Sequence, residues 1–112
     1  MNETISEFIR AKKIDSIYKL NLLLFLHQNP DVQGTSRCFA EKLYLGDIRL
    51  VDKVVAELAD RGVINYSGQH YFLANTPEIK VPLQHLAHSY EHPLSRQTLL
   101  KRIQAGGQLE KY

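Results

Sequence analysis

Three histidines near the C-terminal end of the chain have a spacing that could hold a metal ion. His85, His88 and His92 are three and four residues apart, so they would share one face of a helix. Imidazole is a common metal ligand and titrates near neutral pH, so the triplet could also sense pH. The opposite face would carry Leu83, Leu86, Ala87, Tyr90 and Leu94. We therefore expect the histidines to point outward, and we favour a solvated polar face over a metal site because Pro93 interrupts the last turn.

Cys38 is the single cysteine, and it adjoins Arg37. A neighbouring cation favours the reactive thiolate, which would suit a redox sensor. We favour the alternative that Cys38 is a small apolar residue beside the core. One cysteine excludes an internal disulfide and a paired-cysteine zinc site, and it fits a reducing compartment. We predict a cytoplasmic protein.

No set of residues predicts catalysis. The sequence contains no glycine-rich phosphate loop, no nucleophile elbow and no H-E-x-x-H. The carboxylates of Asp47 and Asp52 have basic neighbours on a predicted helix, which indicates a surface. We expect neither an enzyme nor a bound cofactor.

Most of the elements that must position these residues are predicted to be helices. Thr4 and Glu7 have the spacing of a capping box, which predicts a helix to about Lys13. Leu-rich residues 16–28 predict a stronger helix that ends before Pro30. A third helix is expected from Thr35 or Ser36 to about Leu45. A fourth is expected over residues 48–61, capped by Asp47 and ended by Gly62, with one apolar face formed by Val51, Val54, Val55 and Leu58.

The periodicity changes after Gly62. Ile64 and Tyr66 alternate with polar residues, and Tyr71 and Leu73 do the same after a turn at residues 67–70, which predicts a β-hairpin. Two short helices are then expected, one over residues 82–91 and one over residues 95–104 that ends at Gly106. An apolar strip on the last helix, formed by Leu94, Leu99, Leu100 and Ile103, would either pair two subunits or pack on the chain's own core.

The apolar and glycine positions resemble those of a known family. Three segments carry the pattern: Phe39-Ala40-x-x-Leu43, then Val51-x-x-x-Val55-x-x-Leu58-x-x-x-Gly62-Val63-Ile64, then Tyr71-x-Leu73. Together they are similar to the pattern of bacterial and archaeal winged-helix regulators, the broad group of MarR-, ArsR- and TrmB-like repressors. The resemblance covers about residues 16–74. It implies a mainly α winged helix-turn-helix with a small β-hairpin wing. The chain departs from the pattern in the turn between Leu43 and Val51, which is one residue longer than the commonest spacing.

The resemblance also implies a DNA-binding surface. In this family the helix here expected over residues 48–61 enters the major groove, and the hairpin touches the minor groove or the backbone. Arg49 is the best candidate for a bidentate contact to guanine. The start of the preceding helix could hold phosphate. The implied DNA-binding residues are Thr35, Ser36 and Arg37, then Arg49, Leu50, Asp52, Lys53 and Ala56, then Ser67, Gln69 and His70 at the tip of the wing.

The charge distribution qualifies this expectation. The chain of 112 residues has a net charge of +2. Residues 1–30 contribute +1, residues 31–62 and 63–79 contribute −1 each, and residues 80–112 contribute +3. The predicted groove helix has four acids and three bases from Asp47 to Arg61, and the wing has no Lys or Arg. Because phosphate neutralisation supplies most non-specific affinity, we expect a homodimer on double-stranded DNA, with a protein–protein interaction module as the alternative.

Length and composition fit one domain. We predict a single domain over residues 1–112, with a winged-helix core at residues 16–74 and a helical extension at residues 76–112. The longest apolar run, Leu22 to Leu26, is far short of the ~20 residues that span a bilayer, so we expect no membrane partner. Glu3 and Glu7 also argue against a secretory signal.

Overall fold

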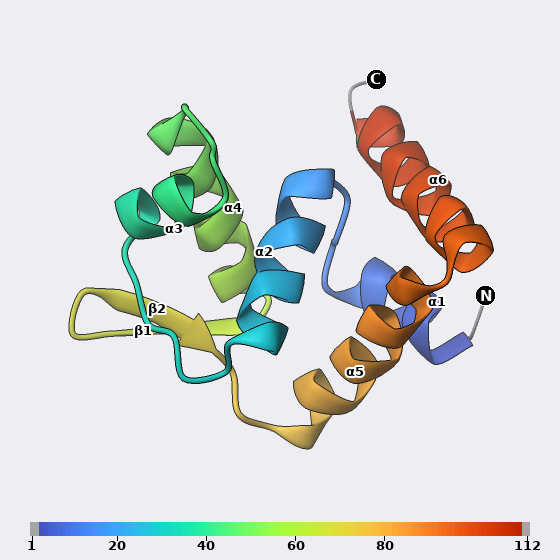
Figure 1. Ribbon diagram of the computed structural model, residues 1–112, viewed down its shortest axis with the longest axis horizontal. Helices are drawn as coiled ribbons and strands as arrows, with labels where there is room; N and C mark the ends of the chain where they lie inside the picture. The colour runs from blue at the N-terminus through green and yellow to red at the C-terminus, as the bar shows by residue number, and fades with distance from the viewer. Residues whose placement is uncertain (1–2, 111–112) are drawn as a thin grey trace.

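α2 is the helix around which the other elements are arranged in the computed structural model, which describes the backbone of residues 3–110 and the side chains of residues 3–103. It spans Ile17–Gln28 and is mostly apolar, so other elements can cover several of its faces. Ser16 caps it, since its hydroxyl accepts a hydrogen bond from the backbone N–H of Lys19 at 3.2 Å. Figure 1 shows α2 between the pair α3 and α4 on one side and α1, α5 and α6 on the other.

α3 and α4 start where the sequence predicts. α3 spans Ser36–Lys42, and the Thr35 hydroxyl accepts a hydrogen bond from the N–H of Cys38 at 3.2 Å. α4 spans Ile48–Asp60, and the Asp47 carboxylate accepts from the N–H of Arg49 at 3.0 Å. α3 ends three residues before the predicted Leu45, because Tyr44 adopts a left-handed backbone with φ of 57°.

The predicted apolar face of α4 is confirmed. Its buried residues are Val51, Val54, Val55 and Leu58. Gly62, with φ of 75°, ends this segment, and the N–H of Val63 bonds back to the carbonyl of Leu58 at 3.0 Å. The chain thereby turns into the hairpin with Val63 fully buried.

The hairpin consists of β1 (Ile64–Ser67) and β2 (His70–Leu73), paired antiparallel with Ile64 opposite Leu73. Gly68 and Gln69 both have positive φ, which suits the tight turn of a two-residue hairpin. Gly34, before α3, adds two backbone hydrogen bonds to Tyr71, at 3.0 and 2.7 Å. The predicted combination of a mainly helical fold and a small hairpin is therefore correct.

α1 spans Glu3–Ala11 and buries Ile5, Phe8 and Ile9. Thr4 lies inside its first turn, so the prediction that Thr4 is the N-cap is wrong. The helix ends two residues before the predicted Lys13 because Lys13 takes a left-handed backbone, with φ of 52°. α1 packs against α5.

The C-terminal helices differ most from the prediction. α5 spans Pro77–Glu91 and contains Pro82 rather than starting there. Pro77 is well placed at the first helical position, and the burial of Ile79 and Leu83 stabilises the turns around Pro82. α6 spans Pro93–Glu110, so Pro93 starts this helix and the backbone stays helical through the glycines at which the helix was predicted to end.

The apolar strip of α6 divides between core and surface. Leu99 and Ile103 are buried in the same cluster as the side chains of α2 and α4, which favours packing on the chain's own core over subunit pairing. Leu94, predicted on the inner face, is 80% exposed. Within the described part of the chain, no helix has the length and apolar character needed to cross a membrane.

Candidate nucleic-acid interface

The outward face of α4 carries most of the predicted groove residues. Arg49, Asp52, Lys53 and Ala56 are exposed, opposite the buried valine face of the same helix. Leu50 is half-buried and packs against the core. The structure therefore presents four of these five predicted side chains to solvent and uses Leu50 for packing.

The start of α3 offers one exposed cation. Arg37 is exposed, whereas Ser36 is 9% exposed. Thr35 is exposed, but its hydroxyl is the acceptor of the α3 cap. A phosphate at this helix start would therefore meet the Arg37 guanidinium rather than the Ser36 hydroxyl.

The hairpin tip is polar and uncharged apart from histidine. Ser67, Gln69 and His70 are all exposed, and Nδ1 of His70 lies 2.8 Å from the carbonyl oxygen of Gly68. Figure 1 shows the hairpin extending on the same side of α2 as α3 and α4. The structure thus places the three segments that hold the predicted residues on one side of α2.

A buried ion cluster behind α4 was not predicted. Lys19 of α2 is 3% exposed, and its Nζ lies 2.8 Å from Oδ1 of Asp15, 2.9 Å from Oε2 of Glu57 and 2.8 Å from the carbonyl oxygen of Lys13. Burial lowers the pKa of Lys19, but the hydrogen bonds to Asp15 and Glu57 outweigh burial and the net effect raises it. The four-residue spacing of Asp15 and Lys19, at the start of a predicted helix, could have indicated half of this cluster.

This cluster changes the charge that α4 presents. Glu57 is paired with Lys19, and Asp47 is directed at the N–H groups of Arg49 and Leu50. The other charged residues of the segment are two acids and three bases, Asp52, Asp60, Arg49, Lys53 and Arg61. The excess of acid counted from the sequence is therefore partly offset by internal partners.

A basic side chain of the N-terminal segment also reaches α4. Nζ of Lys12 donates a hydrogen bond to the carbonyl oxygen of Arg61 at 3.2 Å, which caps the C-terminal end of the helix. The basic pair Lys101 and Arg102 lies on α6, which Figure 1 places on the other side of α2 from α3 and α4. Lys12 is thus close to the C-terminal end of α4, and the pair Lys101 and Arg102 is remote from the candidate interface within one subunit.

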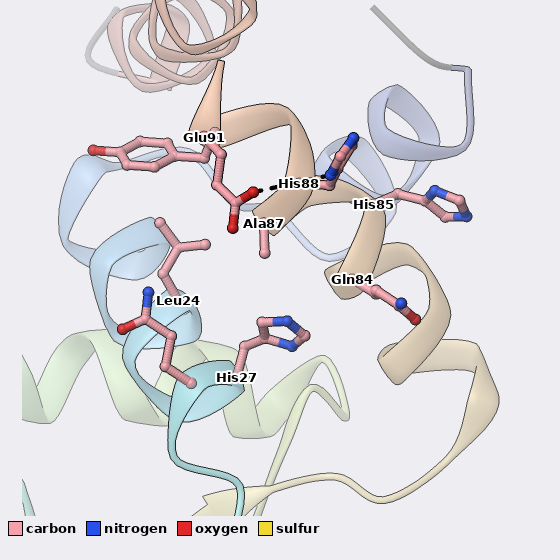
Figure 2. Close-up of a pocket in the computed structure, with 9 residues that line it drawn as sticks. Leu24, His27, Gln84, His85, Ala87, His88 and Glu91 are labelled. Carbon is pink, nitrogen blue, oxygen red and sulfur yellow. Dashed lines mark ion pairs between the residues drawn. The ribbon is translucent and has the colours of Figure 1, made fainter. Parts of the chain in front are cut away.

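The predicted histidine face lies beside an open groove between α2 and α5. His85, His88 and His92 are exposed, as predicted. Figure 2 shows His27 of α2 opposite Gln84, Ala87 and Glu91 of α5. The groove that these residues line has a volume of about 740 Å³. Nδ1 of His88 is 4.0 Å from Oε2 of Glu91. Among the described residues, no three His, Cys, Asp or Glu side chains are grouped so as to hold a metal ion.

Cys38 is half-buried. Its neighbour is Gly34, where an added Cβ atom would lie 3.1 Å from the cysteine Sγ. This close approach fits the predicted role of Cys38 as a packing residue.

Comparisons with known proteins add no information about the candidate interface, so it is inferred from its side chains. No protein family, curated protein or solved structure matches the chain.

Proposed function

We propose that the protein is a winged helix-turn-helix regulator that binds double-stranded DNA as a homodimer, with α4 in the major groove. The observation that carries this proposal is the two-sided character of α4. One side packs four apolar residues into the core, and the other exposes Arg49 and Lys53 to solvent. A helix held in this way can offer its outer side chains to base edges while the domain keeps its fold.

The neighbouring elements support the same proposal. Arg37 at the start of α3 can contact phosphate, and the hairpin lies on the same side of α2. Internal partners for Glu57 and Asp47 reduce the repulsion that α4 would exert on DNA. A dimer would double the basic contacts, with the two α4 helices about one DNA turn, ~34 Å, apart.

The test is a titration of the full chain onto random and genomic duplexes at low and moderate salt. We expect salt-sensitive binding that weakens in Arg49→Ala and Lys53→Ala. Lys101→Ala is the matched control, because it removes a cation from α6, remote from α4. Sedimentation measures the oligomeric state of the free protein. Absence of binding at low salt, even at high protein concentration, would refute the proposal.

The second candidate is a protein–protein interaction module. Residues 63–74 contain no Lys or Arg, and Tyr66 on the hairpin is 58% exposed, with its ring 4.7 Å from that of Tyr71. Exposed tyrosines are common in protein interfaces. Two results together would favour this candidate. The protein would co-purify with a defined partner that Tyr66→Ser no longer retains, and it would bind no DNA at low salt.

A further inference from the structure

Three helices end in the same hydrogen-bonded motif. After each helix one residue takes a left-handed backbone, and the N–H of the next residue bonds back to a carbonyl of the last turn. The bonds run from Ile14 to Ile9 at 3.0 Å, from Leu45 to Ala40 at 2.8 Å and from Val63 to Leu58 at 3.0 Å. The left-handed residues are Lys13 after α1, Tyr44 after α3 and Gly62 after α4.

Tyr44 is an unfavourable residue for this position. Its φ of 57° lies in the region where a Cβ atom meets the following carbonyl, so glycine would be more stable there. Burial of the ring does not offset this cost, because Tyr44 is 95% exposed. Strained residues of this kind are common at sites that bind other molecules.

The turn that holds Tyr44 joins the two helices of the candidate interface. Lys42 precedes it by two residues and is exposed at the end of α3, and Arg49 is exposed in the first turn of α4. Glu41 is the nearest exposed acid on α3. The carboxylate of Asp47 points back to the N–H groups of α4. A phenol in the turn between these two helices can donate a hydrogen bond to a phosphate oxygen of a duplex that α4 contacts.

We propose that Tyr44 is a DNA-contact residue whose hydroxyl donates a hydrogen bond to a backbone phosphate next to α4. The proposal rests on the proposed function. It accounts for an aromatic side chain that is strained in the backbone and exposed to solvent. It also gives a role to the turn that is one residue longer than in the family that the chain resembles.

The experiment separates folding from binding. Tyr44→Gly and Tyr44→Asn both suit a left-handed backbone, so we expect each variant to unfold in urea at or above the wild-type midpoint. Their affinity for the best genomic duplex should fall by about tenfold, the loss of one hydrogen bond to a charged group. Tyr44→Phe should lose affinity to a similar extent. Leu94→Ser is the control, because it alters another exposed apolar residue, at the start of α6.

Each outcome has one meaning. Full affinity in Tyr44→Gly and Tyr44→Asn, with Arg49→Ala still impaired, overturns the role of Tyr44 and leaves the proposed function intact. Full affinity in Tyr44→Phe alone overturns the hydrogen bond from the hydroxyl. A wild-type protein that binds no duplex at low salt overturns the proposed function and this inference together.

Discussion

Lys19 is a charged residue held in the interior by partners from the turn just before α2 and from the distant helix α4. Its ammonium lies within 2.9 Å of carboxylates from Asp15 and Glu57 and also reaches the carbonyl of Lys13. An ammonium has three N–H groups, so three acceptors satisfy it. The cluster joins the turn before α2 to α4, and it adds a polar contact to the apolar packing of that helix.

Replacing Lys19 by Met should destabilise the protein by about 2 kcal/mol at neutral pH. The substitution keeps the length of the side chain but removes the ammonium that bridges the carboxylates of Asp15 and Glu57. The cost should be below that of a fully buried pair because the Glu57 side chain is 46% exposed. Urea unfolding of both proteins measures the difference, with Lys80→Met as an exposed control.

The stabilisation from Lys19 should also decrease at alkaline pH. The folded-state pKa of Lys19 is raised above 10.5, its value in an unfolded chain. The contribution is therefore fully present below pH 10.5 and is lost as pH rises through the folded-state pKa. The stability difference between wild type and Lys19→Met should be constant from neutral pH to that point and shrink above it. This assignment would be contradicted if the difference in the free energy of unfolding between the two proteins did not shrink at alkaline pH and shrank only at acidic pH.

At the scale of elements, local signals in the sequence predicted the helices and turns of the middle of the chain. Thr35 and Asp47 cap helices as expected, α2 begins within a residue of its predicted start, and Gly62 takes the left-handed turn after α4. These features succeed because each depends on neighbours within a few residues.

The signals failed where distant packing decides the outcome. Pro82 looked like a helix start, yet burial of Ile79 and Leu83 keeps the helix continuous across it. The pairing of Lys19 with Glu57 joins residues far apart in sequence. The burial of Ser36 and the half-burial of Leu50 likewise follow from how α3 and α4 pack.

The Asp47 cap allows charge and helix stability to be separated at α4. Asparagine caps helices about as well as aspartate, so Asp47→Asn should change the free energy of unfolding by less than about 0.5 kcal/mol. It removes a negative charge beside Arg49, so affinity for duplex DNA at low salt should rise by about threefold.

Glu78→Gln is the matched control for Asp47→Asn. It removes an exposed acid from the first turn of α5, and Figure 1 shows the start of α5 below α2, apart from α3 and α4. An equal gain of affinity in both variants would indicate an effect of net charge rather than of position. A weaker affinity in Asp47→Asn, with stability unchanged, would count against α4 as the groove helix.

At the scale of the whole molecule, α5 and α6 belong to the same core as α2, α3 and α4. Ile79, Leu83 and Leu86 from α5 and Leu99 and Ile103 from α6 join one buried cluster with the side chains of α2 and α4. The segment after residue 76 was expected to be an extension of a smaller core. Its buried residues predict instead that the protein loses its fold when this segment is disturbed.

Leu99→Ala should therefore destabilise the entire protein, by about 3 kcal/mol, as expected for a leucine with no exposed surface. Leu58→Ala in α4 is the matched variant, since Leu58 is also 0% exposed. If the chain is one cooperative unit, both variants should unfold in a single transition with the wild-type dependence on urea. A separable α6 would give a different result, because Leu99→Ala would then melt α6 early while the hairpin and α4 kept the wild-type midpoint. Circular dichroism, which follows all helices, and Tyr66 fluorescence in a variant that lacks the other tyrosines, which follows the hairpin, distinguish the two results.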